Sequence, residues 1–230
     1  MSVLKPLLFD PLSQGTRILQ QGDVLGGAEY YNTNSTVGAS TLTAPQLVAG
    51  ILKRTGPVAG FIDTTDSASN IINQMLAGQF IGSGSLIGGQ GGNAGVQPGT
   101  TWRLRYINTV AFAMTLAAGT GVTIVANGNV NASSVKDYLL TVTNGTPQQT
   151  FVANQTNASA VITGLTQAQT NQLTVGMAVT GTNIAANSVI ISIQPGIGVT
   201  LNNNATATLS LNSLTFSPTM TIEGIGQGLL

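Results

Sequence analysis

Residues that could carry out catalysis are scarce in this 230-residue chain. It contains seven Lys or Arg, seven Asp or Glu, no His and no Cys. Without His it lacks the commonest general base and transition-metal ligand, and without Cys it lacks disulfides and thiolate metal sites. Serines are abundant, but nucleophilic catalysis also needs a base and an orienting group beside the attacking side chain. We therefore predict that the protein is not an enzyme, with no catalytic, cofactor-binding or metal-binding residues.

The acidic residues offer two further kinds of chemistry. Asp63 and Asp66 are close enough in sequence to suggest the carboxylate pair of a glycosidase. They also precede a predicted helix, where carboxylates cap free N–H groups and complement the helix dipole, and we interpret them in this way. Together with Asp10 and Asp23 they could supply oxygen ligands to calcium, but no loop has the alternating ligands of a calcium motif.

Basic residues cluster locally in two places, Lys53–Arg54 and Arg103/Arg105. We interpret both as solvated strand ends rather than as a phosphate-binding patch. The net charge is zero, so the chain lacks the electrostatic footprint of a nucleic-acid-binding protein. We predict no nucleic-acid partner.

A Gly-rich segment, "GSGSLIGGQGGNAGVQPG", contains the loose spacing of a dinucleotide-binding fingerprint at Gly89, Gly91 and Ala94. No strand leads into it, no apolar-periodic helix follows, and no acidic residue stands about 20 positions further on. We interpret it as a surface loop or assembly contact. The chain also has no uninterrupted apolar stretch near the roughly 20 residues that span a bilayer, and no cleaved signal sequence is recognisable. We therefore predict no membrane partner and synthesis in the cytoplasm.

Charge is the most unusual property of the composition. Charged residues make up 6% of the chain, against about 25% in ordinary globular proteins. No residue between Asp137 and Glu223 is charged. A surface so poor in charge repels its neighbours weakly, which suits a protein that lives inside an assembly.

The elements that position these residues are mainly strands. Two short helices are predicted, one over 44–49 after Thr43 and one that begins at Asp66 or Ser67 and ends at Gly78. From Thr101 onward apolar residues recur at every second position, and turn residues separate the stretches. This spacing predicts an antiparallel sandwich or barrel. Four more strand-like stretches follow within the uncharged segment: "SAVITGL", "LTVGMAVTGTNI", "SVIISIQPGIGVTL" and "ATATLSLNSLTF".

Several stretches resemble a small jelly-roll family of tailed bacteriophages. They are "STLTAPQLVAGILKRTG", the helix-like "SASNIINQML", the strands in "WRLRYINTVAFAMTLAAGTGVTI" and "KDYLLTVTN", and the opening "LFDPLSQGTRILQQGDVLGG". Members of that family are usually head decoration (cement) proteins or related virion surface proteins. In the family a last strand follows the "TVTN" strand within a few residues, whereas here "TMTIEGIG" begins only at Thr219. The resemblance therefore implies an insertion in the final hairpin.

The fold class that we predict is mainly β: an antiparallel jelly-roll-like β-sandwich with one or two short helices, an extended N-terminal arm and a small inserted β module. The predicted domains are the arm at 1–40, a discontinuous jelly roll at 41–144 plus 217–230, and the inserted β domain at 145–216.

Two functions are compatible with these observations. The resemblance implies a structural virion protein on the capsid surface, a decoration or cement protein that binds the major capsid protein, bridges capsid subunits and associates with itself as a homotrimer. The alternative is a tail or head fibre or adhesin that uses the inserted module to bind the host surface. Aromatic residues that could stack on a sugar are few in that module, where only Phe151 and Phe216 occur.

Overall fold

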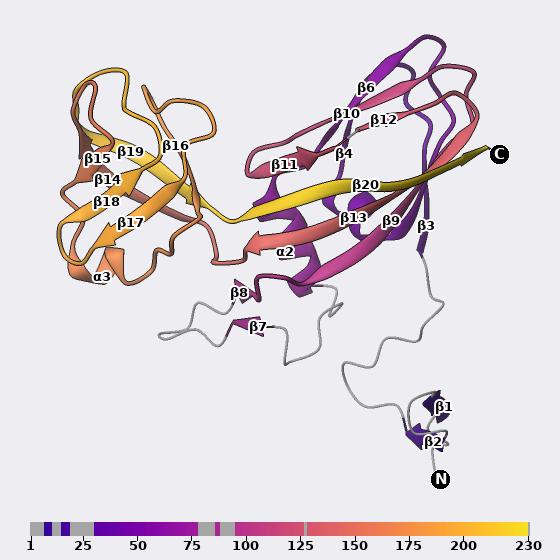
Figure 1. The fold of residues 1–230 in the computed structure, drawn as a ribbon, viewed down its shortest axis with the longest axis horizontal. Helices are drawn as coiled ribbons and strands as arrows, with labels where there is room; N and C mark the ends of the chain where they lie inside the picture. The colour runs from indigo at the N-terminus through magenta and orange to yellow at the C-terminus, as the bar shows by residue number, and fades with distance from the viewer. Residues whose placement is uncertain are drawn as a thin grey trace.

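The computed structural model describes residues 7–10, 15–18, 30–77, 86–87, 95–126 and 128–229. Most of them lie in two lobes joined by a two-stranded ribbon, the first lobe on the right of Figure 1 and the second on the left. Strands predominate in both lobes, so the prediction of a mainly β protein with a β-sandwich is confirmed. No helix among the described residues is long and apolar enough to cross a membrane.

The first lobe is a sandwich of two sheets that enclose one apolar core. The six-stranded sheet has the order β11-β20-β13-β9-β5-β3 and the four-stranded sheet the order β12-β10-β6-β4. The bounds of these strands are β3 Tyr30–Asn34, β4 Ser40–Leu42, β5 Gly50–Arg54, β6 Phe61–Thr65, β9 Thr101–Asn108, β10 Met114–Ala117, β11 Val122–Val125, β12 Asn129–Val130, β13 Ser134–Asn144 and β20 Thr219–Leu229.

The chain winds around this sandwich in successive turns. From β3 to β13, apart from the small pair β7 and β8, each strand belongs to the opposite sheet from the one before it. Each full turn brings the chain back in the same direction, so β3, β5 and β9 pair in parallel, as do β4, β6 and β10. The antiparallel pairing that we expected holds for β9, β13 and β20 and for β10 with β12, whereas the lobe as a whole is mixed.

Two helices pack into the same core and follow their predicted positions. Helix α1 (Ala44–Val48) begins after Thr43, whose N–H donates to Gln46 Oε1. Helix α2 (Ala68–Ala77) begins after Ser67, whose Oγ accepts from the Asn70 N–H at 3.2 Å. Their apolar sides carry buried Leu, Val, Ile and Met residues that contact the strands.

The second lobe has its own core and its own six-stranded sheet, of order β16-β19-β14-β15-β18-β17. A short helix, α3 (Gln167–Thr170), is capped by Thr166. The "SVIISIQPGIGVTL" stretch contains two strands rather than one, because it turns at Gly196. The bounds are β14 Gln149–Gln155, β15 Val161–Thr163, β16 Ala178–Thr180, β17 Ile190–Gln194, β18 Gly198–Leu201 and β19 Leu209–Ser217.

The ribbon between the lobes consists of β13 continuing into β14 and β19 continuing into β20. β13 pairs with β20, and β14 pairs with β19, so the uncharged segment extends the last hairpin of the first lobe. Hydrogen bonds fix the junction: Asn144 Nδ2 donates to Thr174 Oγ1 at 2.8 Å and to the Val175 carbonyl at 2.9 Å. Thr219 Oγ1 donates to the Gly176 carbonyl. No apolar cluster of described residues spans the two lobes.

The predicted N-terminal arm differs in part from the structure. Its last residues form β3, which pairs with β5 at the edge of the six-stranded sheet, so they belong to the first lobe. Nearer the N-terminus, β1 (Leu7–Asp10) and β2 (Gly15–Ile18) form an antiparallel hairpin. Residues 35–40 connect β3 to β4 and begin that strand, and the remaining residues of the arm lie outside the described residues. Within the predicted Gly-rich loop, β7 (Leu86–Ile87) pairs with β8 (Gly95–Val96).

Candidate functional site

Three stacked arches close one end of the first lobe. Residues 35–39, 55–60 and 109–113 connect β3 to β4, β5 to β6 and β9 to β10. Each arch carries the chain from the six-stranded sheet to the four-stranded sheet, and all three start strands that run in the same direction. None of them contains a charged residue. The arches therefore form one uncharged end surface.

Main-chain hydrogen bonds hold the arches against one another. The Thr55 N–H donates to the Asn34 carbonyl at 3.1 Å, and the Thr109 N–H donates to the Arg54 carbonyl at 3.2 Å. At Gly56 a Cβ atom would lie 2.1 Å from the Ser35 carbonyl oxygen. Only glycine allows the arches to approach so closely, because such a contact is far shorter than any van der Waals distance. The arches are thus a packed layer.

A row of buried polar side chains supports the arches from below. Asn34, Arg54 and Asn108 end β3, β5 and β9 and are direct neighbours in the sheet register. All three are buried. Asn34 Oδ1 accepts from the Thr36 N–H, and Asn108 Nδ2 donates to the carbonyls of Phe112 and Asn131, both at 2.8 Å. We call these three residues the polar ladder. It satisfies arch main-chain groups that would otherwise be costly to bury.

Arg54 is the centre of the polar ladder. Its guanidinium donates to the Thr36 and Gly38 carbonyls, both at 2.6 Å, which fastens the first arch. Nε and Nη2 make a bidentate pair with Asp63 at 2.8 and 3.0 Å, and both side chains are 0% exposed. The guanidinium also lies 5.0 Å from the centre of the Phe61 ring. This fully bonded buried ion pair ties β5 to β6, that is, one sheet to the other.

Asp63 accepts a further hydrogen bond from Tyr106. The Tyr106 hydroxyl lies 2.6 Å from Asp63 Oδ2. Burial, and then the negative charge of Asp63, raise the pKa of Tyr106 well above its ordinary value. Tyr106 is therefore a permanent hydrogen-bond donor rather than an acid or base. No buried polar side-chain atom is left without a partner in the described part of the chain, so the network is structural.

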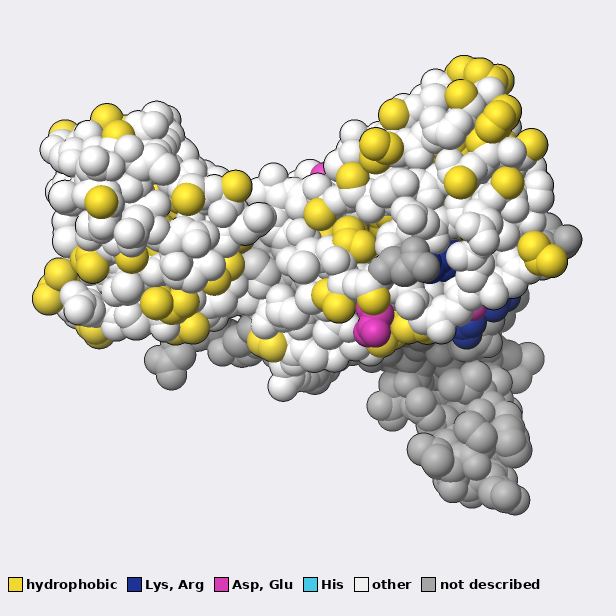
Figure 2. All heavy atoms as spheres, turned by 45° about the horizontal axis from the view of Figure 1, so that its top comes forward, with side chains coloured by type: hydrophobic (Ala, Val, Ile, Leu, Met, Phe, Trp, Pro, Cys, Tyr) yellow, Lys and Arg dark blue, Asp and Glu magenta, His cyan; other side chains and the backbone are white. Residues whose placement is uncertain are grey.

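Above this network the arches present apolar side chains to solvent. The exposed fractions are 69% for Val37, 70% for Val58, 39% for Phe112 and 52% for Ile62 at the start of β6. Exposed alanines lie between them. We call this surface the apolar tip: Val37, Ala39, Val58, Ala59, Ile62, Ala111, Phe112 and Ala113. Figure 2 shows hydrophobic side chains gathered at the upper right, where β4, β6 and β10 begin.

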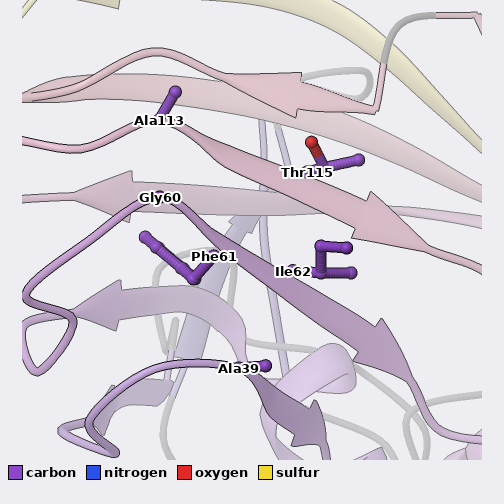
Figure 3. Close-up of a pocket in the computed structure, with 6 residues that line it drawn as sticks. All are labelled: Ala39, Gly60, Phe61, Ile62, Ala113 and Thr115. Atoms are coloured by element: carbon purple, nitrogen blue, oxygen red, sulfur yellow. The ribbon is translucent and has the colours of Figure 1, made fainter.

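A shallow groove of about 460 Å³ runs along this surface. It is lined by Ala39 before β4, by residues 60–62 of β6 and its arch, by Ala113 at the end of the third arch and by Thr115 of β10. Figure 3 shows Ile62 and Thr115 side by side on neighbouring strands, in agreement with their register. None of the residues that line the groove is charged.

The basic residues fulfil the prediction only in part. Arg103 and Arg105 are exposed on β9 and pair with Asp137 on β13, as solvated strand residues do. Burial alone would raise the pKa of Asp137, but hydrogen bonds from Arg105 and Arg103 outweigh it and lower that pKa. For Arg54 the interpretation as a solvated strand end was wrong, because adjacent strand residues point to opposite faces and Arg54 faces the core.

The two carboxylates that we predicted at the start of the helix, Asp63 and Asp66, have different roles in the structure. Asp66 Oδ1 accepts from the Ser67 N–H at 2.8 Å and from Asn70 Nδ2 at 2.7 Å, so it supports the start of α2 as expected. Asp63 does not cap the helix, because it lies in β6 and binds Arg54. The role of Asp63 was missed because the partner that buries it comes from another strand.

The remaining candidates are the metal ligands, the glycine fingerprint and the two phenylalanines of the second lobe. The described residues contain no group of three or more His, Cys, Asp or Glu that could hold a metal ion. Gly89, Gly91, Ala94 and Asp23 lie outside the described residues. Phe151 and Phe216 lie 6.0 Å apart between ring centres, and Phe216 is fully buried, so this pair belongs to the core of the second lobe.

Comparisons of the chain with known protein families, curated proteins and solved structures found no match. The resemblance to phage jelly-roll proteins therefore stays a prediction.

Proposed function

We propose that this protein is a structural virion protein of a tailed bacteriophage, a decoration or cement protein on the outside of the head. The observation that carries the proposal is the apolar tip: exposed, uncharged and held rigid by the polar ladder. Large exposed apolar patches on a protein surface mark sites of contact with other proteins. A rigid patch also loses little conformational entropy on binding, so more of the contact energy becomes affinity.

In this proposal the apolar tip contacts the major capsid protein and the copies associate as homotrimers. A cement protein must bridge capsid subunits that are already packed side by side. Uncharged surfaces meet in such a lattice without like-charge repulsion, and cyclic closure buries their edges. The low charge of the whole chain and the network around Arg54 are both compatible with this role.

The first experiment is localisation on purified virions by cryo-electron microscopy. We expect density for this protein at repeated positions over the head surface. Density confined to the tail tip would contradict the decoration role and favour the adhesin. The mass of the isolated protein by light scattering is expected to be three times 23.4 kDa.

The second experiment tests the apolar tip itself. Val58→Asp places a charge on the tip, and Val175→Asp is the matched control because Val175 is 57% exposed in the second lobe. Burying one valine is worth about 1.5–3 kcal/mol, so Val58→Asp should weaken rebinding to heads stripped of the protein by about tenfold or more. Equal rebinding by the two variants would show that the apolar tip does not contact the capsid.

The adhesin remains the second candidate function because the second lobe has a separate core and stands apart from the first at the end of the ribbon. In that case the second lobe would bind the host surface, and Val175→Asp, not Val58→Asp, would reduce adsorption of the phage to its host.

A further inference from the structure

A cleft lies at the junction of the two lobes. It has a volume of about 870 Å³ and is lined by residues 118–124 of the first lobe, by residues 178–180 and 186–189 of the second, and by Thr219 of the ribbon. In Figure 2 the surface dips between the two lobes. None of the lining residues is charged or aromatic. This cleft is distinct from the apolar tip.

The two walls of the cleft start from the same point of the ribbon. β11 pairs with β20 from Met220 onward, and β16 pairs with β19 from Ser217 backward, so both strands begin beside Pro218 and run away from it (Figure 1). Gly121 lies at this point with φ +75°, and a Cβ there would be 2.5 Å from the Pro218 carbonyl oxygen. The geometry of the cleft is therefore fixed by close backbone packing.

One wall is an open sheet edge. β11 pairs with β20 on one side, and its other side pairs with no strand in the described part of the chain. The Gly121 carbonyl accepts from the Met220 N–H, so by the alternation of a strand the main-chain groups of Ile124 point away from β20. Edge strands are normally protected by a charge or a proline, and Val122–Val125 has neither.

The opposite wall offers polar groups without charge. Thr180 and Asn187 are exposed there, whereas Ser188 is buried and its Oγ donates to the Ala185 carbonyl at 2.8 Å. Asn187 has φ +59°, a left-handed conformation that non-glycine residues seldom adopt. Sugars are usually held by stacking on aromatic rings, which the cleft lacks, and charged ligands would lose hydration there without gaining an opposite charge.

From these observations we propose that the cleft binds an extended, uncharged peptide segment of a neighbouring protein, which adds as a strand to the open edge of β11. About four residues of the segment would lie along Val122–Val125, at roughly 3.3 Å per residue. The Val122 N–H already donates to the Gly119 carbonyl at 3.0 Å, so the segment would bond mainly to the main-chain groups of Ile124. The inference rests on the proposed function only in that the neighbour is a protein of the same assembly.

The experiment uses the whole 15N-labelled protein and three probes followed by NMR. The probes are the end-blocked peptide Thr-Val-Thr-Val-Thr-Val, the same peptide with two Val replaced by Lys, and maltohexaose. We expect saturable shifts of the β11 amide signals with the first peptide and at least tenfold weaker binding of the Lys peptide. Equal binding of both peptides, shifts elsewhere only, or no shifts at all would overturn the proposal. Binding of maltohexaose in the cleft would replace it with a sugar site.

Variants make the test specific to the cleft. Thr123 is exposed in the cleft, so Thr123→Lys should weaken binding of the first peptide at least tenfold, and Thr120→Lys is a second variant at the same wall. Thr163→Lys, on an exposed position of β15, is the control and should bind like the unchanged protein. Equal binding by all the variants would contradict the site. This assay contains no virions, so its failure is independent of where the protein lies on the phage.

Discussion

Replacing Arg54 by Met should unfold the first lobe while the second lobe stays folded. The Arg54 and Asp63 side chains are both fully buried, so the substitution leaves a buried carboxylate with only Tyr106 as a hydrogen-bond donor among the contacts described above. Breaking a buried ion pair from one side costs about 3–5 kcal/mol. The carbonyls of Thr36 and Gly38 lose their donors too, at about 1–3 kcal/mol each. These losses approach the whole stability of a typical domain, about 5–15 kcal/mol.

The chain provides a natural signal that is specific to the first lobe. Trp102 is the single tryptophan, it lies in β9, and its Nε1 donates to the Leu47 carbonyl at 3.2 Å. The second lobe has neither Trp nor Tyr. Trp102 fluorescence during urea denaturation therefore reports on the first lobe, and far-ultraviolet circular dichroism reports on both. In Arg54→Met the fluorescence transition should move to much lower urea or disappear, and a circular dichroism transition should remain.

A double variant separates the ion pair from general damage to the core. Arg54→Met combined with Asp63→Leu removes both charges, so its loss of stability should be about 2 kcal/mol smaller than the sum of the two single losses. A loss below about 1 kcal/mol in Arg54→Met, or strict additivity in the double variant, would refute the reasoning, because a buried pair must show both effects.

Three further predictions concern the junction, the surface and the second lobe. Asn144→Ala removes two hydrogen bonds at the junction, so the contact between the lobes should lose about 1–2 kcal/mol of free energy. Small-angle scattering should then show more mobile lobes, while the Trp102 unfolding transition stays unchanged. An unchanged scattering profile would contradict the role of Asn144 at the junction. Because folding lowers the pKa of Asp137 below its ordinary value of 3.8, the ionised carboxylate stabilises the folded protein above pH 3.8. This stabilisation is lost as the pH falls through the folded-state pKa. Asp137→Asn should therefore cost under about 1 kcal/mol at pH 7 and nothing at low pH, measured as urea midpoints. Deleting residues 145–216 and joining the ends with a short turn should leave a first lobe that still unfolds cooperatively in urea, as followed by Trp102 fluorescence. Loss of this cooperative unfolding would show that the deleted segment is part of the core of the first lobe.

Much of the local structure follows from short-range patterns. The alternation of apolar residues from Thr101 onward predicted strands, and "SVKDYLLTVTN" forms β13 while "TTWRLRYIN" contains β9 with Leu104 and Tyr106 on its buried face. Both helices of the first lobe begin where capping residues placed them. These predictions succeed because strand alternation and helix capping depend on residues within a few positions of one another. β14 was missed, because "QTFVANQ" has weak alternation and gains its strand form by pairing with β19.

Less of the candidate site could be predicted from the sequence. The apolar tip combines three segments that lie between Val37 and Ala113 in the sequence, and none of them is unusual alone. Lys53 and Arg54 are identical in charge and adjacent in sequence, yet Arg54 is fully buried and Lys53 is half-buried. A clue was present, because alternation along "GILKR" places Leu52 and Arg54 on the same face. What the sequence lacks is the identity of the partner, Asp63, which comes from the opposite sheet.

By itself the sequence determined the scarcity of charge, the dominance of strands and the two capped helices, since each is a matter of composition or near neighbours. The interruption of the last hairpin was implied only by the resemblance to a family. The tertiary structure alone decided that the strands of the first lobe wind in parallel turns, because a period of two is the same in parallel and antiparallel strands. That winding stacks the three arches, aligns Asn34, Arg54 and Asn108 beneath them, and exposes the apolar tip above. These residues are far apart in the sequence and meet only because the chain winds around the sandwich. Their contacts therefore could not be predicted from local sequence patterns.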